Sequence, residues 1–193
     1  LARSFSADLF GQWVLFIAAG SFVEMFRSGI TNIGLVRYLS GADEAYSIQL
    51  IGSNALIGIS STVIVSFIIV LSNIIFHNAI QHSGYQLFFT WYPLLAFLNL
   101  PWNNAILVLQ ARRKYGKILA LKAFNSVGFF IVLFLNMYYF KMTLLQIVWV
   151  NLVINALTSF VALAAGWDGF KYIKQANKET SKTLLHFGKY TTF

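Results

Sequence analysis

The sequence predicts an all-α fold, a polytopic transmembrane helical bundle of about five spans, and three observations support this prediction. Of the 193 residues, 58% are hydrophobic and only 10% are charged, whereas soluble domains carry roughly a quarter charged residues. The mean hydropathy is +0.69. Long uncharged runs alternate with short polar or basic segments along the whole chain, which is the pattern of a protein that crosses a membrane several times.

The first span is expected over residues 10–39, and Ser6 and Asp8 are both able to cap the helix that enters it. A helix needs about 20 residues to cross roughly 30 Å of hydrocarbon, so this longer run must tilt or emerge partway. Gly29 and Gly34 lie in its second half. They either allow the helix to hinge or unwind there, or allow another helix to pack closely.

The second span is expected over residues 48–76, a run without charged residues, and a short polar turn at 77–84 separates it from a third span at 85–111. The third span contains both prolines of the chain, Pro93 and Pro101. A proline inside a helix removes a backbone donor and crowds the preceding turn. We therefore expect this helix to be bent, with neighbouring helices or water satisfying the freed carbonyl groups.

Two more spans, at 118–140 and 144–167, complete a bundle over residues 1–167. After residue 167 the composition becomes polar and rich in lysine. Residues 168–193 are expected to form a basic linker or an amphipathic helix on the membrane face, leading to a next helix.

The basic residues indicate the orientation of the bundle. One set of alternate ends carries most of them: Arg37, Arg112, Arg113, Lys114, Lys117, Lys122 and the lysines from Lys171 onward. The other set has only Arg3 and Lys141. Since cytoplasmic loops are enriched in Lys and Arg, the basic loops are expected to be cytoplasmic and the start of the chain extracytoplasmic. An odd number of spans should then precede residue 1, and we expect the chain to be a fragment cut at both ends.

The composition argues against several functional classes. The net charge of +8 does not indicate a nucleic-acid partner, because the basic residues form short clusters between apolar runs. Cysteine is absent and the three histidines are scattered, so neither a disulfide framework nor a metal site is expected. No nucleophile elbow, Walker lysine loop or zinc-protease motif is present. We expect no enzymatic activity and no cofactor.

Glu24 and Arg27 are the most informative residues of the first span, because ionisable groups are costly inside hydrocarbon. Their i, i+3 spacing places them within pairing distance on one helix face. One interpretation is a mutually neutralised pair with Arg27 reaching toward the interface. The other, which we favour, is that this face lines an aqueous cavity where Arg27 meets an anionic group such as phosphate. Arg37 is either a headgroup and topology charge or a second substrate contact.

Asparagines form a second group of candidates. Asn99 and Asn103 share a face of the third span beside Pro101. Such amides either hydrogen-bond neighbouring helices, with about 0.6 kcal/mol gained on average, or line a polar route through the membrane. Asn54, Asn125, Asn151 and Asn155 admit the same two interpretations, and Asn151 and Asn155 again fall on one face.

Several short motifs together resemble one transporter family. They are the aromatic entry at Phe10, Gly11 and Trp13, the R-x-G of Arg27 and Gly29, the G-L-V-R-Y-L-S run at 34–40, the Q-A-R-R-K-Y-G-K loop at 110–117 and H-F-G-K-Y at 186–190. In this order they resemble the Wzx-like oligosaccharide flippases and polysaccharide transporters of the MOP superfamily. That superfamily also includes the MATE exporters and the lipid II flippase.

The resemblance implies that the chain is helices two to six of an N-terminal lobe, with the first helix and the second lobe missing. It implies a transporter of the bacterial inner membrane that moves a polyprenyl-diphosphate-linked oligosaccharide by alternating access, for surface polysaccharide biosynthesis. Its partners would be this lipid-linked glycan and membrane lipids. Arg27 first and Arg37 second match the cations that hold the diphosphate, and Glu24 would tune Arg27 or couple transport to a cation or proton. Asn99 and Asn103 complete the expected substrate-binding set.

Three alternatives remain. A MATE-like cation-coupled exporter would use intramembrane acidic residues, and Glu24 is the one expected here. A non-transporting assembly subunit would use its polar residues only to join helices. A membrane glycan polymerase would need acid and base residues in extracytoplasmic loops, and the loops on that side are short.

Overall fold

The computed structural model describes residues 5–191, apart from the side chains of Ile30 and of residues 188–191. The fold of this part is all-α and contains no strand. In chain order the helices are α1 (Ala7–Leu39), α2 (Glu44–Ile75), α3 (His77–Gln81), α4 (Gln86–Ala111), α5 (Tyr115–Leu135), the π-helical turn η1 (Asn136–Phe140), α6 (Leu144–Ala164), the 3₁₀ turn η2 (Phe170–Gln175) and α7 (Lys178–Thr191).

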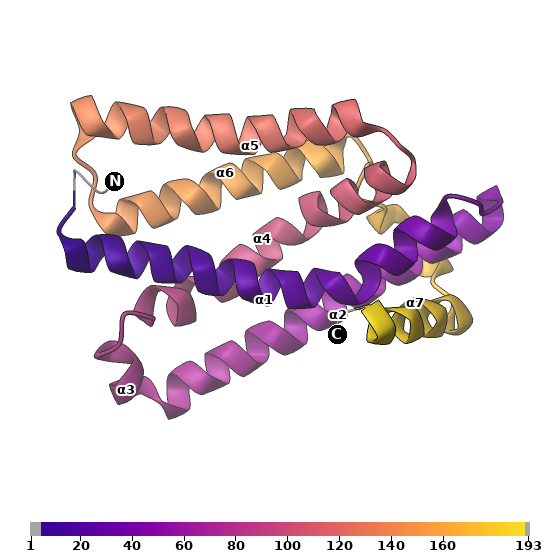
Figure 1. Cartoon of the computed structure of the whole chain (residues 1–193), viewed down its shortest axis with the longest axis horizontal. Helices are drawn as coiled ribbons and strands as arrows, with labels where there is room; N and C mark the ends of the chain where they lie inside the picture. Colours follow the sequence, from indigo (N-terminus) through magenta and orange to yellow (C-terminus); the bar gives the residue numbers. More distant parts are fainter. Residues whose placement is uncertain (1–4, 192–193) are drawn as a thin grey trace.

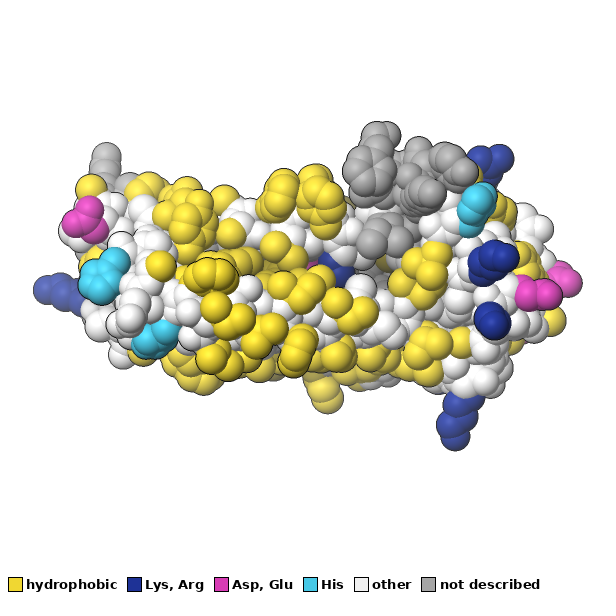
Figure 2. Space-filling model, turned by 90° about the horizontal axis from the view of Figure 1, so that it is seen from below, with side chains coloured by type: hydrophobic (Ala, Val, Ile, Leu, Met, Phe, Trp, Pro, Cys, Tyr) yellow, Lys and Arg dark blue, Asp and Glu magenta, His cyan; other side chains and the backbone are white. Residues whose placement is uncertain are grey.

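Five of these helices, α1, α2, α4, α5 continued by η1, and α6, are long and apolar enough to cross a membrane. They run roughly along the long axis of the molecule (Figure 1), and hydrophobic side chains cover the middle of the face seen in Figure 2 while most charged side chains gather at its two ends. The chain is therefore a multi-pass membrane protein. We call the end where α1, α4 and α6 finish the basic end, because it carries Arg37, Arg112, Arg113, Lys114 and Lys117.

The expected spans are confirmed, with shifts at their ends that local capping explains. Ser6 caps α1, accepting a hydrogen bond from the Leu9 backbone at 3.5 Å. The second helix begins at Glu44 rather than at 48, because Asp43 caps it and accepts from the Tyr46 backbone at 2.7 Å. Polar residues that looked like loop therefore form the first turn of α2.

One local expectation was wrong, and the structure bears on the two alternatives left open for Gly29 and Gly34. The segment at 77–84 is not only a turn, since it contains the short helix α3. The first span does not unwind at Gly29 or Gly34, since α1 is one continuous helix, although this helix changes direction along its length (Figure 1). Gly34 faces α7, where a Cβ built on it would lie 3.5 Å from the side chain of Leu184, an ordinary van der Waals contact that does not require a glycine.

The central helix of the bundle is α4, which packs against α1, α2 and α6. Its Tyr92 and Leu95 belong to a core cluster with Trp13 and Phe16 of α1 and Val148 of α6. The outermost spanning helix is α5, in which Leu121 is the one buried residue. Since α4 contacts most of the bundle, its polar residues are the ones that can meet several helices at once.

Near Pro101 a side chain from a neighbouring helix contacts the backbone, although not at the Phe97 carbonyl that the proline leaves without its helical donor. The hydroxyl of Ser159 on α6 accepts a hydrogen bond from the Trp102 backbone N–H at 3.3 Å and donates one to the Leu98 carbonyl. A side chain from the next helix thus bridges the donor and acceptor of one helical turn at the proline. This bridge keeps α4 continuous and joins it to α6.

The C-terminal segment contains η2 and the helix α7, and it packs against the rest of the bundle. Its apolar side faces protein, since α7 packs against α1 and α2 and Leu184 is completely buried. The hydroxyl of Ser53 on α2 accepts from the Asn177 backbone at 3.2 Å and lies 2.5 Å from the Thr180 hydroxyl. Gly52 permits this approach, because a Cβ at that position would overlap the carbonyl of Tyr172. The segment is therefore an integral part of the bundle.

Candidate functional site: a polar cavity inside the bundle

A cavity of about 280 Å³ lies between α1, α4, α5 and α6. It is lined by polar residues from all four helices: Ser21, Glu24, Tyr92, Asn99, Trp102, Asn103, Asn125, Asn151 and Asn155. Phe16, Ile17 and Leu95 supply apolar wall. One carboxylate and five carboxamides thus converge on a single space within a set of membrane-spanning helices, where polar groups are costly unless they have a role.

Helical spacing brings these residues together. Asn99 and Asn103 lie four residues apart on α4, and Asn151 and Asn155 repeat that spacing on α6, so each pair presents both amides on one face. On α1 the small residue Gly20 lies beside them, and a Cβ there would come within 3.2 Å of the Tyr92 ring. The absence of a side chain at this position lets the tyrosine reach the cavity wall.

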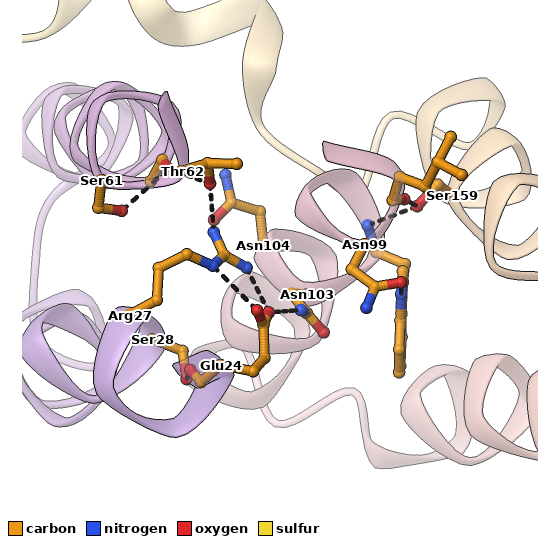
Figure 3. Close-up of polar contacts among 12 residues, drawn as sticks. Glu24, Arg27, Ser28, Ser61, Thr62, Asn99, Asn103, Asn104 and Ser159 are labelled. Carbon is orange, nitrogen blue, oxygen red and sulfur yellow. Dashed lines mark hydrogen bonds and ion pairs between the residues drawn. The ribbon is translucent and has the colours of Figure 1, made fainter. Parts of the chain in front are cut away.

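The carboxylate of Glu24 is the centre of a polar cluster that we call the Glu24 clamp, formed by Glu24, Arg27, Thr62, Tyr92 and Asn103. Arg27 forms an ion pair with Glu24 and donates a second hydrogen bond to it from Nε at 3.0 Å. The Asn103 amide donates to the same carboxylate, and the Tyr92 hydroxyl does so at 3.3 Å. Figure 3 shows Arg27 and Asn103 pointing at Glu24 from either side.

Arg27 also reaches away from the cavity. Its Nη1 donates to the Thr62 hydroxyl at 2.7 Å, and Thr62 in turn donates to the Gly58 carbonyl at 2.7 Å (Figure 3). The clamp therefore joins α1, α2 and α4. Charge-assisted bonds of this kind are stronger than neutral ones, so the clamp fixes the relative positions of three helices.

The substrate role that we favoured for Arg27 stays a prediction, and the structure shows where its side chain lies. Its side chain is only 3% exposed, against 21% for Glu24, and the polar cavity is lined by Glu24 and not by Arg27. Arg27 does not extend to the interface either, because Glu24 and Thr62 hold it in the middle of the span. The structure thus shows the pairing of the two charges that both interpretations shared, and of the two side chains it is Glu24 that lines the polar cavity. The i, i+3 spacing predicted the pairing but not which side chain would be enclosed.

The amides fall into two groups. Asn125 donates to Asn155 at 3.2 Å and to Thr158 at 3.1 Å, and Asn155 donates to Asn151 at 3.0 Å. These bonds join α5 to α6 and fit the interpretation of asparagine as a link between helices. In contrast, the Nδ2 atoms of Asn99 and Asn151 have no hydrogen-bond partner among the side chains described, nor has Oδ1 of Asn103. They supply donors and an acceptor to the cavity.

Arg37 lies outside this cavity. It is exposed near the end of α1, its guanidinium carbon 5.1 Å from the centre of the Phe187 ring, and it lines a separate pocket. Of the five residues expected to bind substrate, the structure brings Glu24, Asn99 and Asn103 together, places Arg27 behind Glu24 and separates Arg37 from all of them.

Several lining residues were not in the predicted set. Asn125, Asn151 and Asn155 were recognised only as intramembrane amides, although the spacing of the last two already placed them on one face. Trp102 lies between the predicted Asn99 and Asn103 in sequence, but neither it nor Tyr92 was predicted to line a site, since aromatic residues are abundant in membrane helices at interfaces and in packing. Within residues 5–191, no group of three or more His, Asp or Glu side chains is placed to hold a metal ion.

Comparison with known proteins finds no match among protein families, curated proteins or solved structures. What the cavity does must therefore be argued from its chemistry. The main feature of the site is a polar cavity lined by residues of four membrane-spanning helices.

Proposed function

We propose that the chain is part of a membrane transporter that flips a polyprenyl-diphosphate-linked oligosaccharide across the bacterial inner membrane by alternating access, and that the polar cavity receives the glycan. The observation that carries the proposal is the set of unpartnered amide groups beside aromatic and apolar walls, inside a bundle of spanning helices. The sequence motifs that resemble the oligosaccharide flippases support the same assignment.

The cavity chemistry suits a sugar. A sugar hydroxyl both donates and accepts hydrogen bonds, and a carboxamide offers both groups as well. Asn99 and Asn151 supply donors, and Asn103 supplies an acceptor. Trp102 adds an aromatic surface against which the apolar face of a sugar ring can lie.

The charge of the cavity is consistent with a neutral glycan rather than with the diphosphate. Glu24 is the one acid that lines it, and the Arg27 guanidinium neutralises that acid from behind. In this proposal Arg27 orients Glu24, which accepts hydrogen bonds from the glycan, and the diphosphate binds elsewhere in the protein. The basic end faces the cytoplasm, as the distribution of Lys and Arg favours.

The proposal is tested by measuring flipping of a lipid-linked oligosaccharide in proteoliposomes that contain the whole transporter of which the chain is proposed to be part. The variants Asn99→Leu and Asn151→Leu keep the side-chain size but remove the amides, and each should slow flipping by about tenfold, the effect of losing about 1.4 kcal/mol. Asn78→Leu, an exposed residue of α3, is the matched control. If both cavity variants flip the glycan at the rate of the control, the cavity is not the glycan site.

A cation-coupled exporter of the MATE kind is the second candidate, and one observation favours it. The Glu24 side chain is 21% exposed and lines the cavity, so a cation or proton could reach it. An exporter would move cationic drugs in proportion to a sodium or proton gradient, whereas the proposed flippase would not transport them. Efflux of such a drug from the same proteoliposomes separates the two candidates.

A further inference from the structure

The stretch from the end of α4 through the first two turns of α5 carries a concentrated positive charge. Five of the residues 112–122 are basic and none is acidic, and we call their surface the α5 basic surface: Arg112, Arg113, Lys114, Lys117 and Lys122. All five side chains are exposed. None of them lines the polar cavity or belongs to the Glu24 clamp, so what balances this charge is a question separate from the glycan proposal.

No salt bridge neutralises these cations within the described part of the chain, since the pair of Glu24 and Arg27 is the one salt bridge there. The sequence has no acidic residue between Glu44 and Asp168. Asp168, at the same end of the bundle, is buried and accepts a hydrogen bond from the Phe170 backbone at 2.7 Å. The counter-charge must therefore come from outside the described residues.

Two of the cations stand where the local backbone does not favour them. Arg113 has a left-handed backbone, with φ 55°, just after α4, where glycine is the usual residue. Lys117 lies in the first turn of α5, and the dipole of a helix disfavours a positive charge at that end. The Lys117 ammonium lies 4.8 Å from the centre of the Trp167 ring, which follows α6. Residues kept against the local preference indicate that their charge is used.

The position of Lys122 indicates where the counter-charge lies. The helix α5 is at the edge of the bundle (Figure 1), and Tyr115, Leu119 and Lys122 follow one another on one exposed face of it, Leu119 being 69% exposed. Lys122 lies seven residues after the start of α5 at Tyr115, about 10 Å along the helix. Helical side chains lean toward the N-terminus, so the flexible lysine extends back to the basic end. Its ammonium therefore reaches the depth of lipid headgroups.

We propose that the α5 basic surface binds anionic phospholipids. The lipid phosphate lies against Lys117 and Lys122, and an acyl chain runs down α5 over Val127 and Phe130, which are 53% and 66% exposed. The loop residues 112–114 join two spanning helices directly, so their cations stay in the headgroup layer and favour a lipid with net negative charge. An acidic protein in the aqueous phase would reach this loop but not Lys122, which lies on a face that is otherwise apolar.

The test is native mass spectrometry of the purified protein, titrated with phosphatidylglycerol, which is anionic, and with phosphatidylethanolamine, which has a phosphate but no net charge. The wild type should bind the anionic lipid at least about fivefold more tightly. Lys122→Gln should weaken phosphatidylglycerol binding about fivefold, and combining it with Lys117→Gln about 25-fold, since each lysine near the membrane surface contributes similarly. Lys182→Gln, at an exposed lysine of α7, makes the same change of net charge and should bind as the wild type does.

Three results would overturn the proposal. Equal weakening in Lys122→Gln and Lys182→Gln would mean that lipids respond to the net charge of the protein. Equal binding of the two lipids by the wild type would mean that the negative charge is not recognised. Unchanged binding in the double variant would mean that no lipid headgroup meets this part of α5. Because both lysines are exposed, the variants should fold normally, which their thermal unfolding midpoints verify. No glycan enters the measurement, so its outcome is independent of the flipping assay.

Discussion

Arg27 is more deeply buried than Glu24 in the Glu24 clamp, so removing the charge of Glu24 should destabilise the protein more than removing the charge of Arg27. Glu24→Gln leaves the Arg27 guanidinium, whose side chain is 3% exposed, without a counter-charge. Breaking a buried pair in this way costs about 3–5 kcal/mol, and the lower end applies because Gln can still accept one hydrogen bond. Arg27→Gln leaves a carboxylate that is 21% exposed to the cavity and still accepts from Tyr92 and Asn103. That variant should lose only about 1–2 kcal/mol.

Thermal unfolding in detergent, followed by tryptophan fluorescence, measures this difference. At about 2–4 °C per kcal/mol for a chain of this size, Glu24→Gln should lower the midpoint by about 6–12 °C and Arg27→Gln by about 2–8 °C. The double variant should unfold above Glu24→Gln, since it no longer buries an unpaired charge. An Arg27→Gln variant as unstable as Glu24→Gln, or a double variant equal to the sum of both, would refute the assignment of the buried partner.

Two further predictions concern the helices around the cavity. Ser159→Ala removes the hydroxyl that bridges the backbone at Pro101, and it should cost about 1–3 kcal/mol, visible as a lower unfolding midpoint that Ser159→Thr restores. Leu184→Ala should release α7 from the bundle, because Leu184 is completely buried and such a truncation costs about 2–5 kcal/mol. Faster hydrogen exchange or proteolysis of α7 would show the release. The neighbouring Leu185→Ala, 45% exposed, should change neither.

The sequence predicted the spans well because a span is indicated by the composition of a long stretch of residues rather than by any single residue. Twenty or more apolar residues in a row exclude most other structures, and this holds without knowledge of any partner. The ends of the spans were less certain, because capping depends on single residues: Asp43 began α2 one turn earlier than the hydrophobic pattern indicated. A polar contact from a neighbouring helix was expected near Pro101, but nothing in the sequence indicated that Ser159 would make it.

The candidate site was predicted only in part, for a geometric reason. Spacing along one helix predicted that Glu24 meets Arg27 and that Asn99 and Asn103 share a face. It could not predict which face meets which neighbour, so the enclosure of Arg27 against Thr62 and the convergence of amides from α5 and α6 were not foreseen. The same holds for α7, since an amphipathic pattern shows that an apolar side is covered but not whether lipid or protein covers it.

The central claim is that the polar cavity is open to water and receives the glycan, and single-cysteine labelling tests it most directly because the chain has no cysteine of its own. Asn99→Cys places a thiol in the cavity, and Ala96→Cys places one on the same helix at a buried position outside it. A membrane-impermeant thiol reagent should label position 99 and not 96, and a lipid-linked oligosaccharide should suppress that labelling. Failure to label position 99 from either side of the membrane, or labelling that the glycan leaves unchanged, would contradict the account.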